Sequence, residues 1–174
     1  MKLTPVMEKF IVHWGEMGTR WGVNRTVAQI HALLYLSPEP LDAEEISATL
    51  GVARSNVSNS LKELMSWGLA KVVHVMGDRR DHFVTMADVW DIFDRIVEER
   101  KKREINPTLT LLRECELEAE DDANLPALSQ KRITDMKNFL ETLTDWHDQM
   151  QKIPRSTLLK MMKLGSKITR LLNL

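Results

Sequence analysis

"GVARSNVSNSLKELMSWGLAKVVHVMGDRRDHFVT", residues 51–85, is the stretch of this 174-residue chain that decides its fold. It begins with a glycine, continues into a helix start rich in serine and asparagine, and then follows an apolar pattern with helical spacing. The β-branched run at 69–75 and the run at 82–85 are typical of two short strands. Gly77 and Asp78 between them are typical of a tight hairpin turn. The stretch therefore predicts a helix followed by a β-hairpin.

A shorter helix is predicted immediately before this stretch. Asp42 and Glu45 are spaced as in a capping box, with aspartate in place of the usual hydroxyl residue, and Gly51 suits a helix stop. The apolar positions of the two helices form one packed seam: Ile46, Leu50, Val52, Val57 and Leu61. Two helices joined by a short turn, with the second packed on one face only, indicate a helix–turn–helix.

The outer face of the second helix is polar. It carries short donors and acceptors beside two basic residues: Arg54, Ser55, Asn56, Ser58, Asn59 and Lys62. Such side chains suit base edges and phosphates in a major groove. A helix N-terminus, here predicted to be capped by Ser55, also attracts phosphate. Contact with double-stranded DNA is the favoured interpretation, and a solvated helix surface is the alternative.

The predicted hairpin carries Arg79 and Arg80 at its tip. A β-wing beside a recognition helix can place its tip in the adjacent minor groove, where narrow A·T-rich DNA favours inserted arginine. Asp78 and Asp81 are expected to brace the two arginines by local hydrogen bonds or ion pairs. A charged hairpin tip without a DNA contact is the alternative interpretation.

These motifs together resemble one protein family. The run "LGVARSNVSNSLKELMSWGLAKVV" and the wing "GDRRDHF" are similar to the winged helix of MarR-type bacterial regulators, and most similar to their GbsR-type subgroup. The resemblance is clearest over residues 40–85. It implies a transcriptional regulator that binds palindromic operators as a homodimer, with terminal helices of both subunits at the interface.

The resemblance also implies roles for individual residues. Carried over by position, the recognition face is Ser55, Asn56, Ser58, Asn59 and Lys62, and the wing is Arg79 and Arg80. The recognition helix departs from a strongly basic pattern, because only Arg54 and Lys62 flank its polar face. Since phosphate contacts usually dominate affinity, we expect each subunit to bind modestly and dimerisation to supply the rest.

The remainder of the chain is mostly helical in pattern. Helices are expected at 5–20, 24–36, 87–104, 129–150 and 155–172, with Pro107 interrupting the chain and Asn24 as an N-cap. The fold class is therefore mainly α with a small β-hairpin wing: a winged helix–turn–helix flanked by dimerisation helices. The expected division is an N-terminal helix at 1–24 that joins the dimer contact, a DNA-binding domain at 25–86, and a helical dimerisation and effector region at 87–174.

Two C-terminal apolar patterns favour a homodimer. The first is a heptad-like seam: Ile133, Met136, Leu140, Leu143, His147 and Met150. The second is the leucine-rich tail: Leu158, Leu159, Met162, Ile168, Leu171 and Leu172. Together they offer more apolar surface than one partner helix needs, so a second chain is expected to cover it. Packing onto the chain's own winged helix is the alternative.

Five aromatic residues raise the question of an effector: Trp14, Trp21, Tyr35, Trp67 and Trp90. Aromatic cages hold quaternary ammonium ligands by cation–π attraction, and the GbsR-type resemblance implies choline or glycine-betaine sensing in some members. Tryptophans at helical spacing are more often part of a core. Core packing is therefore the favoured interpretation, and a pocket for a quaternary ammonium effector is the alternative.

Several function classes are disfavoured. The net charge of −1 excludes a globally basic nucleic-acid binder but not a locally basic one. The single Cys115 and the scattered histidines show no metal-ligand spacing, and we expect no metal, no cofactor and no catalytic residues. The N-terminus lacks a signal-peptide pattern, and no run is apolar over the ~20 residues that span a bilayer. A cytoplasmic protein without membrane contact is expected.

The sequence thus predicts a sequence-specific DNA-binding transcriptional regulator, acting as a repressor on a palindromic operator and responding to an effector. The alternative is a winged helix used only as a protein-interaction module that does not read DNA. The salt dependence of binding distinguishes these two interpretations. DNA binding through basic side chains weakens steeply with salt, whereas binding through an apolar protein interface does not.

Overall fold

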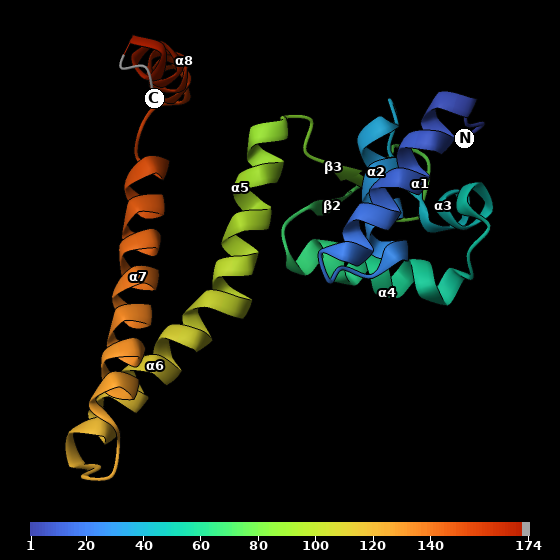
Figure 1. Cartoon of the computed structure of the whole chain (residues 1–174). Helices are drawn as coiled ribbons and strands as arrows, with labels where there is room; N and C mark the ends of the chain where they lie inside the picture. Colours follow the sequence, from blue (N-terminus) through green and yellow to red (C-terminus); the bar gives the residue numbers. More distant parts are fainter. Residues whose placement is uncertain (172–174) are drawn as a thin grey trace. The chain divides into compact units, whose positions relative to one another are not determined.

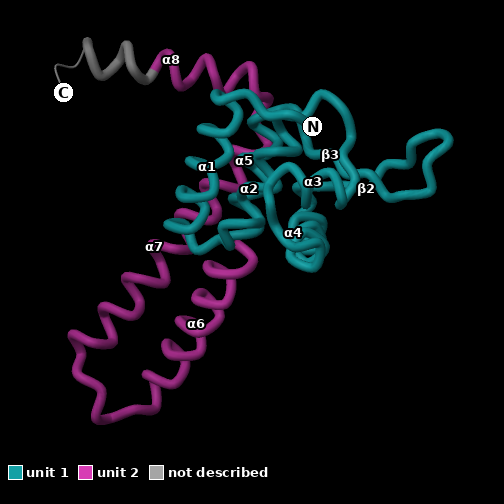
Figure 2. The backbone as a smooth tube through the Cα atoms, turned by 90° about the vertical axis from the view of Figure 1, so that its right-hand side faces the viewer, with its two compact units in different colours: residues 1–100 teal, residues 101–174 magenta. Residues whose placement is uncertain are grey.

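The computed structural model describes the backbone of residues 1–171 and the side chains of residues 1–164 (Figure 1). Its elements follow in the order α1 Pro5–Arg20, α2 Arg25–Leu36, β1 Leu41–Asp42, α3 Ala43–Leu50, α4 Arg54–Ser66, β2 Ala70–Val73, β3 His82–Thr85, α5 Val89–Arg100, η1 Lys101–Ile105, α6 Asn106–Asp121, α7 Ala127–Gln151 and α8 Arg155–Leu171. Two compact units result, the first spanning Met1–Arg100 and the second beginning at Lys101 (Figure 2). The first unit therefore holds α1 and α5 as well as the predicted winged helix.

The local signals of the helix–turn–helix are confirmed. The Asp42 side chain accepts from the N–H of Glu45, and the Glu45 side chain accepts from the N–H of Asp42, which is the predicted capping box of α3. Gly51 ends α3 in the left-handed region with φ 65°, where a side chain would be strained. Asn24 caps α2 by accepting from the N–H of Thr26.

The predicted hairpin belongs to a three-stranded antiparallel sheet of order β1-β3-β2. Strands β2 and β3 pair with Val73 opposite His82, as the sequence predicts for a hairpin. The additional strand, β1, pairs Leu41 with Phe83 and Asp42 with His82. The two residues of β1 are too few to show a periodic pattern, so the sequence did not predict this strand. Through β1, the chain segment that starts α3 lies directly beside β3.

The core of the first unit lies among α2, α3, α4, the sheet and α5. Its largest fully buried apolar side chains are Ile30, Leu33, Ile46, Leu61, Leu64, Val27 and Val57. Helix α1 packs on α2 through small residues, with Gly15 and Gly18 buried beside Gln29 and Ala28. On α5 the residues that face the core are Ile92 and Ile96. The sequence spacing predicts a different buried face for this helix: Val89, Phe93, Ile96 and Val97. That prediction is wrong in part, because Val89 and Phe93 are exposed.

The second unit contains an α6–α7 hairpin preceded by the short π-helix η1. Pro107 lies in the first turn of α6, where its missing N–H costs least. The predicted start of a new helical piece at proline is confirmed, but the predicted interruption is not, because α5, η1 and α6 follow one another without a non-helical residue. A π-helix is a wider turn that often accommodates a local irregularity, and η1 ends two residues before Pro107.

Helix α7 carries two apolar faces where the sequence predicted one seam. Ile133, Leu140 and His147 are half-buried. The same stretch of α7 forms two ion pairs with α6: Lys137 with Glu116, and Glu141 with Arg113. A different series is exposed at heptad-like spacing: Met136, Phe139, Leu143 and Trp146. The predicted seam mixed members of both faces, because a 3-4 spacing fits either one. The predicted tail residues Ile168, Leu171 and Leu172 lie outside the described side chains.

Among the described residues, no helix is both long enough and apolar enough to cross a membrane.

Candidate nucleic-acid interface

Helix α4 presents the predicted polar face to solvent. Arg54, Ser55, Asn56, Asn59 and Lys62 are exposed, and Ser58 is half-buried. The opposite face holds the helix in the core through Val57, Ser60, Leu61 and Leu64. Because one face is fixed by packing, the outer side chains project from a rigid element, as a surface that reads another molecule requires.

The start of α4 differs from the prediction. The helix begins at Arg54 with Ala53 as its N-cap, so Ser55 is its second residue and does not cap it. Ala53 has no side-chain acceptor, and the cap makes no side-chain hydrogen bond. The N–H groups of the first turn therefore point outward beside Arg54, an arrangement that favours an anion.

The wing loop, residues 74–81, connects β2 to β3 and extends from the rest of the first unit (Figure 2). Its tip is a tight turn in which the N–H of Asp78 donates to the Val75 carbonyl at 3.1 Å. Gly77 has φ 84°, as a turn with glycine at its third position requires. Met76 is fully exposed at this tip. Arg79 is also exposed and forms no hydrogen bond or ion pair with any described residue.

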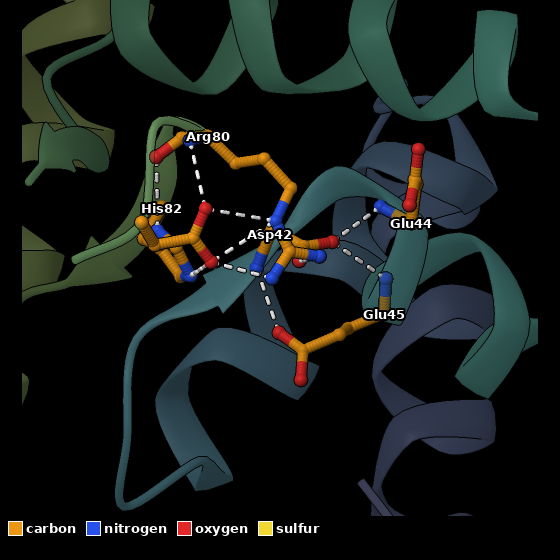
Figure 3. A network of polar contacts seen from close by, with 6 residues as sticks. Asp42, Glu44, Glu45, Arg80 and His82 are labelled. Atoms are coloured by element: carbon orange, nitrogen blue, oxygen red, sulfur yellow. Dashed lines mark hydrogen bonds and ion pairs between the residues drawn. The ribbon is translucent and has the colours of Figure 1, made fainter. Parts of the chain in front are cut away.

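Arg80 lies in a network of polar contacts at the base of the wing loop (Figure 3). Its Nε lies 3.0 Å from both carboxylate oxygens of Asp78, and its Nη2 lies 2.5 Å from Asp78 Oδ2. Its Nη1 lies 2.5 Å from Oδ2 of Asp42, whose side chain is only 2% exposed. The prediction that Asp78 braces the arginines is therefore confirmed for Arg80. Asp81 is exposed and forms no hydrogen bond or ion pair with the described part of the chain.

The network stabilises the charged forms of its members. The hydrogen bond from Arg80 holds the pKa of Asp78 far below its ordinary value and raises the pKa of Arg80. Burial alone would raise the pKa of Asp42. The N–H groups of Glu45 and Glu44 and the positive charge of Arg80 outweigh that effect, so the pKa of Asp42 also lies below its ordinary value. Both carboxylates are thus ionised at neutral pH.

A groove of about 310 Å³ lies between α4 and the wing. Its floor includes Leu61 and Phe83, and its rim carries Arg54 and Lys62 of α4 together with Arg80. The groove brings the recognition helix and the wing base to one surface of the first unit. The structure therefore places all eight predicted DNA-binding positions on the exposed side of α4 or in the wing loop.

The same network contains a group of potential metal ligands. Atoms of Asp42, Glu45 and His82 lie within 4.8 Å of one another. Asp42 already holds Arg80 and two N–H groups, and a Glu45 carboxylate oxygen accepts from the N–H of Asp42 at 3.0 Å. A cation here would have to displace Arg80 from a buried carboxylate. We therefore assign these side chains to the fold.

The five aromatic candidates have different surroundings. Trp14, Tyr35 and Trp67 pack against the core, as the favoured interpretation predicted, and Trp14 stacks on Phe10 with ring centroids 5.4 Å apart. Trp90 is half-buried in α5. Trp21 is exposed, and the guanidinium of Arg100 lies over its ring at 5.7 Å from the centroid. None of the five lines the groove beside α4.

Sequence reasoning did not identify the second carboxylate of the wing network. Asp42 was predicted only as a helix cap. It lies 38 residues before Arg80 in the sequence, so no local pattern links the two residues. The antiparallel register of β1 on β3 brings the two residues together. Only a prediction of that short strand would have revealed the contact.

Comparisons with known proteins agree with this geometry. The sequence model of the MarR family matches residues 21–81, which span α2 to the wing. The chain is 23% identical over 153 residues to YvaV of Bacillus subtilis (strain 168), whose name describes an HTH-type transcriptional regulator, covering 81% of this chain and 86% of that protein. It is 19% identical over 126 residues to the HTH-type transcriptional repressor OpcR of the same organism, covering 72% of this chain and 68% of OpcR. A crystal structure of a transcriptional regulator shares the fold with a TM-score of 0.62 at 19% identity, covering 83% of this chain and 95% of that one.

Proposed function

We propose that this chain is a DNA-binding transcriptional regulator of the MarR family, and that it represses transcription as a homodimer bound to a palindromic operator. Repression is proposed because OpcR, one of the similar proteins, is named as a repressor. The "GDRRDHF" wing supports assignment to the GbsR-type subgroup.

One observation carries the proposed DNA contact: Arg54, Ser58 and Lys62 of the polar face of α4 line the same groove as Arg80 at the wing base. We propose that Ser55, Asn56, Ser58 and Asn59 face base edges in the major groove. Arg54 and Lys62 flank them and would contact phosphates. The wing, which carries Arg79 and Arg80, would lie in the flanking minor groove. In a dimer, two such helices about 34 Å apart would occupy successive major grooves.

The proposed dimer rests on apolar side chains that the described residues leave uncovered. On α7 these are Met136, Phe139, Leu143 and Trp146, of which Phe139 is 62% exposed and Trp146 58% exposed. Large apolar side chains in a continuous exposed row favour a protein contact. A row of one helix can cover the same row of a second copy, as a two-fold interface requires.

We propose the following division of roles along the chain. Residues 25–86 bind DNA, and residues 87–174 dimerise and respond to an effector. Residues 1–24 add to the interface through exposed Val6 and Val12.

The proposed effector is a quaternary ammonium compound. Trp21 supports this class, because its ring already holds a cationic side chain and is 55% exposed. An effector would act by favouring a dimer geometry with the wrong spacing of the two α4 helices, which requires different affinities for the two geometries. Titration with choline chloride, followed by tryptophan fluorescence and by operator binding, tests this proposal. A Trp21→Leu variant that still responds to choline would show that the effector does not bind at Trp21.

Selection of bound sequences from a random duplex pool, at near-physiological salt, tests the proposed function. We expect enrichment of a palindrome whose half-sites are one helical turn apart. Enrichment of a single unrepeated half-site would contradict the dimeric operator. Folded protein that enriches no sequence, with and without choline, would contradict sequence-specific repression.

A further inference from the structure

Helix α8 combines an exposed apolar face with a polar face whose charged residues are all basic. It follows α7 as a separate helix after Pro154, whose carbonyl accepts from the N–H groups of Thr157 at 2.8 Å and Leu158 at 3.0 Å (Figure 1). We propose that α8 binds the surface of an anionic lipid bilayer and lies in the headgroup layer without crossing it. This proposal does not rest on the proposed contact with DNA.

The charge of this part of the chain differs from that of the rest. Residues 149–174 contain six lysines and arginines and no aspartate or glutamate. Since the whole chain has a net charge of −1, the first 148 residues carry a net charge of −7. Clusters of about four to eight basic residues on an amphipathic helix are typical of segments that recognise anionic lipid headgroups. The number and the sign of these charges therefore match an anionic surface.

The apolar and basic residues lie on opposite sides of α8. At about 3.6 residues per turn, Leu158, Met161 and Met162 fall on one face, whereas Lys160 and Lys163 fall on the other. In the sequence, basic residues recur at positions 160, 163, 167 and 170, a spacing that belongs to one stripe of a helix. This segregation is typical of helices that lie in a membrane interface.

The described part of the chain does not cover the apolar face of α8. Met162 is 58% exposed and Leu164 is 56% exposed, and Met161 is exposed beside them. No described element packs extensively against α8. A helix of this length is only marginally stable in water unless its apolar face is buried. A partner that takes up this face would therefore also stabilise the helix.

An anionic bilayer satisfies both faces of α8 at once. Acyl chains receive the apolar side chains, and the long lysine side chains reach the headgroup phosphates. DNA phosphates would neutralise the basic stripe but would leave the methionines in water. A second copy of the chain would cover the methionines but would leave the basic stripe, on the opposite side of the helix, in solvent.

This proposal revises two expectations from the sequence. The expected absence of membrane contact was based on the lack of a run of ~20 apolar residues, which a helix lying in the interface does not require. The expectation that a second chain covers the leucine-rich tail was based on its apolar residues alone. The basic stripe on the opposite face favours a lipid surface instead.

Co-sedimentation of the full chain with lipid vesicles tests the proposal. One set of vesicles contains phosphatidylcholine alone, and the other contains equal parts of phosphatidylcholine and phosphatidylglycerol. We expect binding to the anionic vesicles to be at least about tenfold tighter. This binding should weaken as salt is added, because salt screens the attraction between lysines and headgroups. A chain that does not bind the anionic vesicles would overturn the proposal.

Two double variants separate the contributions of the two faces. Lys160→Glu/Lys163→Glu reverses two charges of the basic stripe. Met161→Gln/Met162→Gln replaces two apolar side chains by polar ones of similar helix propensity. We expect each double variant to bind anionic vesicles at least about tenfold more weakly than the original chain. Full binding by the methionine variant would mean that charge alone adsorbs the protein, which would overturn an interfacial helix.

Lys9→Glu/Arg132→Glu is the charge-matched control. Both residues are exposed and lie outside α8, so the net charge changes as in the lysine variant while α8 is untouched. This control should bind vesicles as the original chain does. An equal loss in the control would attribute binding to the overall charge of the protein and would overturn the role of α8.

Amide hydrogen exchange locates the contact. We expect exchange at residues 155–164 to slow when anionic vesicles are added, because burial of the apolar face stabilises the helix. Vesicles of phosphatidylcholine alone should have little effect. Vesicle binding that leaves exchange at 155–164 unchanged would place the contact elsewhere and overturn the proposal.

Two further measurements identify the occupant of α8 if vesicles do not bind. A changed oligomeric state of Met161→Gln/Met162→Gln in sedimentation equilibrium would assign the apolar face to a second copy. A lower salt slope of operator binding in Lys160→Glu/Lys163→Glu would assign the basic stripe to DNA. Vesicle binding is measured without DNA, so its failure leaves the proposed function intact. A chain that selects no operator likewise leaves the vesicle result unaffected.

Discussion

Gly18 of α1 and Ala28 of α2 lie so close that a Cβ added to Gly18 would be 2.6 Å from the Cβ of Ala28. This separation is shorter than side-chain carbons tolerate, and the Ala28 Cβ cannot move without its backbone. The contact is therefore a point at which the two helices fit together only because residue 18 has no side chain.

Gly18→Ala is expected to destabilise the fold, although alanine is the better helix former by about 1 kcal/mol. Overpacking of this kind costs about 1–3 kcal/mol. Gly15→Ala is the matched control, because its new Cβ would meet the flexible Cγ of Gln29 at 2.7 Å. Urea unfolding should show a larger loss for Gly18→Ala than for Gly15→Ala. Equal effects would mean that α1 can shift on α2.

His31 predicts a pH dependence of stability. It is buried in α2 with no hydrogen-bond partner for Nε2 in the described part of the structure, and burial lowers its pKa to about 4. In the unfolded chain this group has its ordinary pKa of 6.5, so the unfolded state binds more protons between pH 4 and 6.5. Stability therefore falls as the pH drops through this range. From pH 7 to pH 5, protonation of this group in the unfolded chain lowers the free energy of unfolding by about 2 kcal/mol.

The measurement is urea unfolding of the original chain and of His31→Leu at pH 7 and pH 5. The difference between the two proteins removes the contributions of the other titrating groups. The variant is expected to lose less stability on acidification. An identical loss in both proteins would show that His31 is not the source.

Several of these features were predictable from sequence, for identifiable reasons. The capping box of Asp42 and Glu45, the stop at Gly51 and the hairpin around Gly77 depend on neighbours within a few residues, and local sequence records such signals. The outer face of α4 was predictable because Val57, Leu61 and Leu64 define the inner one.

Other features depend on contacts that local sequence does not record. Nothing near Arg80 specifies that Asp42 lies beside it, because the contact is made by a two-residue strand. On α7, spacing alone could not show which apolar residues meet α6, and Ile92 was overlooked because Val89 and Phe93 fit the same period. Ser55 was misplaced as a cap because Ala53 occupies that position without a side-chain bond.

Asn56 and Lys62 are expected to contribute differently to DNA binding. Asn56→Ala should relax the preference at particular base positions at a cost of about 1–3 kcal/mol per lost contact. Lys62→Ala should weaken binding to all sequences and lower the salt slope by about 0.9 per subunit. Sequence selection with each variant, alongside binding at several salt concentrations, separates the two effects. An unchanged preferred site in Asn56→Ala would remove Asn56 from the recognition face.

Phe139→Glu is expected to convert the proposed dimer into monomers, because a charge on the exposed row of α7 would be buried without a partner. Asn138→Glu adds the same charge one residue earlier, at an exposed polar position, and should leave the dimer intact. Sedimentation equilibrium measures both. Operator affinity should fall with the loss of the dimer, and a dimeric Phe139→Glu protein would place the interface elsewhere.

The sharing of Asp42 between a helix start and the wing has an evolutionary consequence. Serine or threonine would cap α3 about as well as aspartate, but neither would neutralise Arg80. Loss of the arginine alone would leave a buried negative charge. Descendants of this gene are therefore expected to exchange the residues at positions 42 and 80 together, so that aspartate at one accompanies arginine at the other. Such paired substitution would show that the contact between residues 42 and 80 is inherited as one unit, although their codons are not adjacent in the gene.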